Sequence, residues 1–115
     1  MKIVLSPAKS LDFVSVPEVK GTTQPIFLSE SEALVKKLKK YSPKKIGELM
    51  SISPKLSDLN HERFQEWSLP FTNKNAKSSV YVFTGDAYRG MDARSFSDED
   101  VAQVQNYLRI LSGLY

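Results

Sequence analysis

The sequence predicts a mixed α/β (α+β) fold in which short buried strands are flanked by helices. Residues 2–5 and 80–83 are apolar runs, rich in β-branched and aromatic side chains, that are too short for helices and end at turn residues. We expect these two runs to pair in one buried sheet. Longer segments with apolar residues at helical spacing lie between and after them, which predicts the flanking helices. At 115 residues the chain fits one domain, residues 1–115.

The first and the last predicted helix begin at polar caps. Residues 29–32 form a Ser-Glu-Ser-Glu capping box, and residues 97–100 place acidic side chains where they interact favourably with the dipole of the last helix. The buried stripe of the first helix is expected to hold Leu34, Leu38 and Tyr41. That of the last helix is expected to hold Val101, Val104, Leu108 and Leu111.

Two further helices are predicted to meet at a tight turn. Pro43 begins a short helical run, and Pro54 begins a second one that Ser53 can cap and that is expected to be interrupted near Asn60. Between them, the Ser-Ile-Ser-Pro-Lys sequence of residues 51–55, here named the 51–55 turn, resembles the hairpin of helix-hairpin-helix DNA-binding motifs. Residues 43–67 are therefore predicted to form a helix-hairpin-helix-like segment.

Two interpretations of the 51–55 turn stay open. In helix-hairpin-helix motifs, glycines flank the apolar residue, so that main-chain N–H groups approach a phosphate and a lysine closes over it. Ser51 and Ser53 stand at the glycine positions here; serine resists a positive φ, although its hydroxyl can donate to phosphate. The pattern also fits an ordinary corner between helices with Ile52 in the core.

The charge distribution points weakly to a polyanionic partner. Sixteen basic and thirteen acidic residues give a net charge of +3, and much of the positive charge directly precedes the 51–55 turn. The basic residues of this run are Lys36, Lys37, Lys39, Lys40, Lys44 and Lys45. Such a run is either a solvated helix face or part of the electrostatic footprint of a nucleic-acid-binding protein.

The residue composition excludes several kinds of chemistry. The chain has no cysteine, which excludes disulfides and thiolate chemistry, and its only histidine, His61, has no second ligand at metal-binding spacing. We expect His61 at the surface or at a helix cap, and we predict neither a metal nor a cofactor. The N-terminal apolar run is too short for a signal peptide and no segment could span a bilayer, so a cytoplasmic protein is predicted.

Polar loops follow both predicted strands, where α/β proteins often place ligands. Residues 6–12 carry Lys9 and Asp12, whose side chains are either functional or simply solvated and paired with each other. Residues 84–90 carry Gly85 and Asp86. Asp86 could act as a hydrogen-bond acceptor, a general base or a cation ligand, or it could cap its own backbone.

Taken together in this order, the motifs resemble the YaaA peroxide-stress family over essentially the whole chain. The residues that carry the resemblance are 6–9 with Leu11 and Asp12, 50–56, Asn60 with Arg63 and Phe64, Gly85 and Asp86 with Tyr88 and Gly90, and Leu108 and Arg109 with 111–115.

The resemblance implies a bacterial cytoplasmic protein with a basic cleft, linked to peroxide resistance through limitation of free iron and to binding of duplex DNA. It places Lys9 in a strand-end loop, Lys55 in the hairpin, Arg63 just behind it, and Arg109 on the last helix facing the same cleft. Family members are longer than this chain. We therefore expect an N-terminal portion of a YaaA-like protein, an incomplete domain whose uncovered apolar edges favour self-association.

The first functional hypothesis is a protein that binds double-stranded DNA without sequence specificity. Ser51, Ser53 and Lys55 would hold one phosphate together with the N–H groups of the turn. The residues expected to hold neighbouring phosphates are Lys44, Lys45, Arg63 and Lys9. Phosphate contacts give affinity but carry no sequence information.

The second hypothesis is an enzyme that acts on a nucleotide or a nucleic-acid base in a pocket between the two strand-end loops. Lys9 and Asp86 would meet there, with Asp86 as general base and Arg109 on a phosphate. The sequence contains no Gly-rich phosphate loop, no metal-spaced histidines and no nucleophile beside a histidine, so no reaction class is specified.

Overall fold

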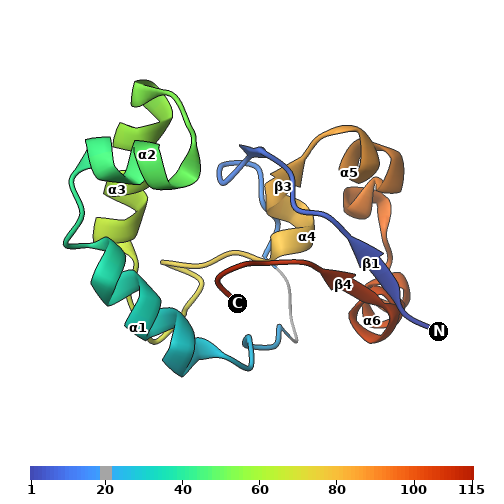
Figure 1. Ribbon diagram of the computed structural model, residues 1–115. Coiled ribbons are helices and arrows are strands. Elements are labelled where there is room, and N and C mark those ends of the chain that lie inside the picture. The colour runs from blue at the N-terminus through green and yellow to red at the C-terminus, as the bar shows by residue number, and fades with distance from the viewer. Residues whose placement is uncertain (19–21) are drawn as a thin grey trace. The chain divides into compact units, whose positions relative to one another are not determined.

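The computed structural model describes residues 1–18 and 22–115 and confirms a mixed α+β fold (Figure 1). Its helices are α1 (Leu28–Leu38), α2 (Pro43–Met50), α3 (Pro54–Glu66), α4 (Ser79–Val82), α5 (Asp86–Met91) and α6 (Asp98–Tyr107), with a 3₁₀ turn at Ala93–Ser95. The strands are β1 (Ile3–Leu5), β2 (Ser10–Leu11), β3 (Phe83–Thr84) and β4 (Leu108–Ile110). Two compact units are formed, described separately below, and the prediction of a single domain over residues 1–115 stays a prediction.

The first unit comprises the described residues of Met1–Thr23 together with Ala76–Gly113. It holds two small sheets: β1 pairs with β4 in parallel, with Val4 opposite Arg109, and β2 pairs with β3 in antiparallel. Its buried apolar core is small. The core side chains are Tyr81, Val82, Tyr88 and Ala93.

The predicted strand at residues 80–83 is wrong, because most of this run forms α4. Tyr81 and Val82 are adjacent in sequence and are both buried, at 8% and 5% exposure. Successive side chains of a strand point to opposite faces, whereas a helical turn can direct two neighbours into one small core. Only Phe83 and Thr84 are extended, and they pair with β2 rather than with residues 2–5.

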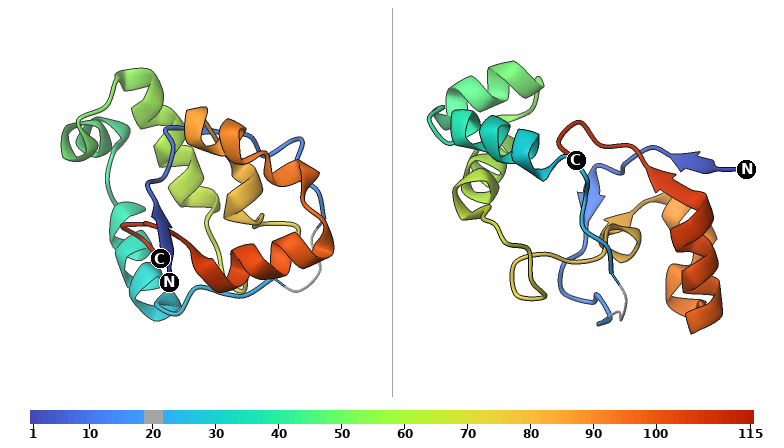
Figure 2. Two further views of the ribbon diagram at one scale, coloured as in Figure 1. Left: turned by 90° about the vertical axis from the view of Figure 1, so that its right-hand side faces the viewer. Right: turned by 90° about the horizontal axis from the view of Figure 1, so that it is seen from below.

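The last helix ends earlier than predicted, at Tyr107, and leads directly into β4 (Figure 2). Leu108 and Ile110 are half-buried and Arg109 between them is exposed, which is the alternation typical of a strand. The placement of Arg109 on the last helix is therefore wrong. The capping box at the start of α6 did form, between Ser97 and Asp100.

The β1–β4 pair is more exposed than the predicted buried strands. Ile3 and Val4 are 49% and 55% exposed. Each strand has a single hydrogen-bonded neighbour in the described residues, so the pair has two open edges.

The second unit comprises Gln24–Asn75 with Leu114–Tyr115 and contains α1, α2 and α3. The capping box predicted at residues 29–32 did not form: the N-cap of α1 is Phe27, two residues before Ser29, and the Ser29 hydroxyl donates to Glu30. The buried face of α1 is formed by Ser31 and Val35, whereas Leu34, predicted to be buried, is 48% exposed. The helix is therefore rotated relative to the expected stripe.

Two consecutive Ser-Pro-Lys sequences begin α2 and α3. The Ser42 hydroxyl accepts a hydrogen bond from the Lys45 N–H, and the Ser53 hydroxyl accepts one from the Leu56 N–H, as expected of N-caps. In contrast to the predicted interruption, α3 is continuous through Asn60, whose side-chain amide donates to the Leu56 carbonyl.

Helices α2 and α3 pack against each other (Figure 1). They approach closely where Gly47 of α2 faces Ser57 of α3. A Cβ atom at Gly47 would lie only 2.4 Å from the Ser57 Oγ. Ser57 is 3% exposed and its hydroxyl donates to the Ser53 carbonyl, while Ile46 beside Gly47 is fully buried. The absence of a side chain at residue 47 therefore sets how closely α2 and α3 pack.

Candidate functional site

The 51–55 turn has the backbone shape that a glycine would ordinarily supply. Ser51 adopts the left-handed conformation, with φ +53° and ψ +50°. This conformation costs a residue with a side chain about 1–2 kcal/mol. The N–H groups of Ser51 and Ile52 both donate to the Gly47 carbonyl, which closes the end of α2. Serine thus takes the positive φ despite its side chain.

The start of α3 presents donors on the other side of the turn. Ser53 is extended, and Pro54 has no N–H group. The N–H of Lys55, at the second helical position, has no acceptor within the helix. Ser51, Ser53 and Lys55 are all exposed. The Ser53 hydroxyl already accepts from the Leu56 N–H as the N-cap of α3, and binding of an anion at this turn stays a prediction.

Some of the lysines that precede the 51–55 turn contact other groups of the protein. The Lys36 ammonium lies 3.3 Å from the Glu32 carboxylate, and the Lys39 ammonium donates to the Trp67 carbonyl at 2.9 Å. Lys44 and Lys45 in the first turn of α2 are exposed, with the Lys45 Nζ 5.0 Å from the centre of the Tyr41 ring. Of the six lysines in this run, only Lys39 is half-buried, and Lys44 and Lys45 are exposed like Lys36, Lys37 and Lys40.

Two other residues, Arg63 and Lys9, are predicted to contribute to DNA binding. Arg63 is half-buried in the last turn of α3, about 12 Å along the helix axis from Lys55. It would therefore reach a different phosphate from the one at Lys55. Lys9 is exposed and belongs to the first unit, so its contribution to the same interface stays a prediction.

The strand-end loops of the first unit adjoin each other. Gly85 has a φ of +133°, and a Cβ atom built there would lie 3.7 Å from the Ala8 Cβ. However, Asp86 is exposed and pairs with Arg89, and the Arg109 guanidinium donates to the Gln105 and Leu108 carbonyls. In the described part of the chain, no hydrogen bond or ion pair joins Lys9, Asp86 and Arg109 to one another.

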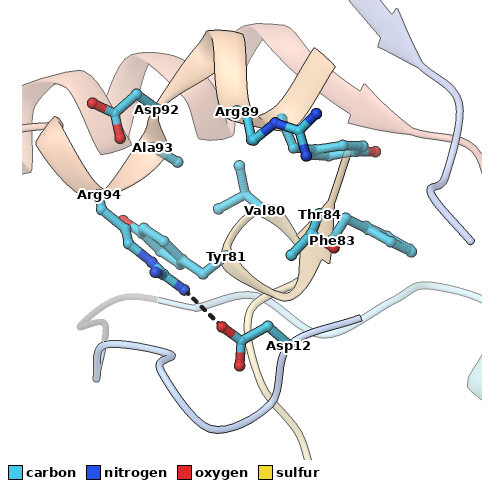
Figure 3. A pocket seen from close by; sticks show the side chains of 10 residues that line it. Asp12, Val80, Tyr81, Phe83, Thr84, Arg89, Asp92, Ala93 and Arg94 are labelled. Atoms are coloured by element: carbon cyan, nitrogen blue, oxygen red, sulfur yellow. Dashed lines mark hydrogen bonds and ion pairs between the residues drawn. The ribbon is translucent and has the colours of Figure 1, made fainter. Parts of the chain in front are cut away.

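A cavity of about 350 Å³ does open beside these loops (Figure 3). We call it the arginine pocket, and the residues most relevant to its chemistry are Asp12, Val80, Tyr81, Thr84, Arg89 and Arg94. The sequence analysis selected Asp12 but missed both arginines, because no local pattern marks Arg89 or Arg94 as neighbours of Asp12.

Asp12 pairs with Arg94 rather than with Lys9. Its Oδ1 accepts hydrogen bonds from the N–H groups of Val14 and Ser15, at 2.9 and 3.1 Å, and its Oδ2 lies 3.3 Å from the Arg94 guanidinium. The hydrogen bonds from Ser15 and Val14 hold the pKa of Asp12 below its ordinary value, and Arg94 adds to this effect. Asp12 is therefore a charged acceptor at neutral pH.

His61, expected at the surface or at a helix cap, lies half-buried within α3. Its Nδ1 is enclosed without a hydrogen-bond partner. Within residues 1–18 and 22–115, no three His, Cys, Asp or Glu side chains gather closely enough to hold a metal ion. None of the helices in this part of the chain combines the length and apolar character needed to cross a membrane.

Comparison with known proteins decides the family. Residues 1–115 match the family model described as "Peroxide stress protein YaaA". The chain belongs to the YaaA family. It is 53% identical to a protein named UPF0246 of Saccharophagus degradans, covering 100% of this chain and 45% of that relative.

Two other UPF0246 proteins give the same result. The chain is 50% identical to one from Burkholderia pseudomallei, covering 100% of this chain and 44% of the relative. It is 51% identical to one from Cellvibrio japonicus, covering 97% and 43%. The chain thus spans less than half the length of the YaaA-family relatives it matches, and the predicted family membership is confirmed.

Proposed function

We propose that this YaaA-family chain binds double-stranded DNA without sequence specificity, through phosphate contacts made by the 51–55 turn. The observation that supports the proposal is the left-handed conformation of Ser51, which closes the end of α2 and leads directly into the exposed start of α3. The Lys55 N–H and ammonium then act on the same phosphate.

The cations around the turn extend the contact to neighbouring phosphates. Lys44 and Lys45 begin α2, which packs against α3, and both side chains are exposed. Arg63 and Lys9 are proposed as outer contacts. Because contacts to phosphates carry no sequence information, affinity is expected to depend on charge and not on sequence.

The biological role proposed for this interaction is protection of DNA during peroxide stress. The family name supports a role in the response to peroxide. We infer that a protein occupying the duplex in the cytoplasm shields phosphates and sugars from iron-dependent oxidative damage. This part of the proposal rests on the DNA interaction and fails with it.

The salt dependence of duplex binding tests the proposal. If Lys44, Lys45 and Lys55 each neutralise one phosphate, the slope of log K against log salt is about −2.7, so affinity falls about 40-fold between 50 and 200 mM salt. Fluorescence anisotropy with labelled duplexes of two unrelated sequences measures this slope. Equal affinity for the two sequences is expected. A salt-independent affinity, or a strong preference for one sequence, would contradict the proposal.

A further inference from the structure

The outer edge of β1 lies in the first unit and takes no part in the phosphate contacts proposed above, so an inference about it stands independently. In the described part of the chain, β1 pairs with β4 alone, and the two strands run in parallel (Figure 1). Parallel sheets are almost always covered on both faces, and two strands by themselves are marginally stable at best. The β1–β4 pair therefore has the form of a sheet that needs a further strand.

The hydrogen bonds between the two strands show which backbone groups of β1 point outward. The Leu5 carbonyl accepts from the Leu111 N–H at 2.9 Å, so the backbone groups of Leu5 are directed toward β4. In a parallel pair, alternate residues of a strand bond to one neighbour, and the residues between them point to the other side. The N–H and carbonyl groups of Val4 therefore point to the open side of β1. Val4 is 55% exposed, so this side is accessible.

The outer edge of β4 is less open than that of β1. The Leu108 N–H, which points away from β1, donates to the Val104 carbonyl at the end of α6. The Leu108 carbonyl accepts from the Arg109 guanidinium at 2.6 Å. Both outward backbone groups of Leu108 thus have partners within the chain, and a strand added at β4 would have to displace them. The edge of β1 is therefore the one that favours strand addition.

The side chains of β1 are those of a strand that is covered on both faces. The register places Ile3 and Leu5 on one face together with the two apolar residues of β4, whereas Val4 lies on the opposite face. Ile3 is 49% exposed and Val4 is 55% exposed, so each face leaves a β-branched side chain in contact with water. A segment that pairs with β1 and packs over these side chains would gain the free energy of apolar burial.

The relatives contain the additional chain from which such a strand can come. The chain spans less than half the length of the YaaA-family relatives it matches, so more than half of each relative lies outside the matched region. A strand supplied from there is tethered to β1, and the high effective concentration allows even a short strand to pair. A second copy of β1 would offer only three residues, far less than a stable interface between separate proteins needs.

We propose that the outer edge of β1 is the docking site for a strand from the part of YaaA-family proteins that lies outside the region matched by this chain. That strand pairs with the N–H and carbonyl groups of Val4. It makes β1 an inner strand of a larger sheet, with β4 as its other neighbour.

Amide hydrogen exchange in two proteins tests this inference, with the Leu5 amide as the reference because it faces β4 in both. The proteins are the 115-residue chain and the intact UPF0246 protein of Saccharophagus degradans, which is 53% identical over this chain. Relative to Leu5, the amide aligned with Val4 is expected to exchange at least about 100-fold more slowly in the intact relative, because it donates to the added strand there. The same ratio of the two rates in both proteins would overturn the proposal.

A proline substitution in both proteins provides a second, independent test. Val4→Pro removes an N–H group that takes no part in the pairing of β1 with β4, and its effects on the local backbone are common to both proteins. It is expected to lower the melting temperature of the intact relative by at least about 5 °C more than that of the 115-residue chain. The control is Ile110→Pro, which removes an outward N–H at the edge of β4 and is expected to lower both melting temperatures similarly. Equal lowering by Val4→Pro in the two proteins would refute the proposal.

The concentration dependence of exchange distinguishes the added strand from a second copy of the chain. Self-association of the 115-residue chain through other apolar surface is expected to leave the Val4 amide in fast exchange at every concentration. If exchange at Val4 slows as the concentration of this chain rises, the edge belongs to a second copy, and the proposal is contradicted.

Discussion

Reversing the charge of Lys55 is expected to lower the affinity for duplex DNA by about 10- to 100-fold. The substitution Lys55→Glu removes one charge-assisted contact, worth about 1.5–3 kcal/mol, and places a carboxylate beside the phosphate. It should also make the slope of log K against log salt less negative by about 0.9, because one phosphate contact is lost. Lys55 is exposed, so the fold is expected to be unaffected.

The matched control is Lys74→Glu. Lys74 is an exposed lysine of the same unit that lies in the turn around Thr72–Asn75, away from α2 and α3 in sequence. The two variants change the net charge equally, so any effect of overall charge is common to both. A loss of affinity of the same size in both variants would show that binding follows net charge and does not depend on the 51–55 turn.

Replacing Ile46 by alanine is expected to lower the free energy of unfolding by about 2–5 kcal/mol. Ile46 on α2 is fully buried, and its neighbour Gly47 makes the closest approach to α3. The truncation leaves a cavity where these helices meet. Leu34→Ala, at a residue 48% exposed on α1, is expected to cost less than about 1 kcal/mol.

Urea denaturation of both variants measures how much each substitution lowers the free energy of unfolding. The comparison of the two variants also tests which residues form the core, because the apolar stripe of the first helix predicted a buried Leu34, whereas the structure has it half exposed. Similar losses for Ile46→Ala and Leu34→Ala would indicate that α1 is rotated toward the expected stripe.

Local signals predicted the starts of α2, α3 and α6. The prolines at residues 43 and 54, with a serine before each, mark helix starts because they act through hydrogen bonds within one turn. The capping box of α6 at Ser97 was predictable for the same reason, because its hydrogen bonds also lie within one helical turn. Sequence alone could not show that Ser51 adopts a positive φ, since that depends on how the end of α2 closes onto Gly47.

Errors arose where a distant partner decides the structure. Leu108 fits a helical stripe, but residues 108–110 are extended because β1, more than 100 residues earlier, pairs with them. Residues 80–83 are an apolar run that fits a strand or a helix equally, and burial of both Tyr81 and Val82 selected the helix. The arginine pocket was missed for the same reason, because Asp12 and Arg94 meet across 82 residues.

The most direct test of the central claim is an amide-shift map of the ¹⁵N-labelled chain with a closed dumbbell duplex, which offers phosphates but no strand ends. We expect the largest shifts at residues 44–45 and 51–56, around the left-handed Ser51 and the start of α3. Shifts confined to the first unit, with residues 51–56 unchanged at saturation, would contradict the claim that the 51–55 turn holds the DNA phosphate.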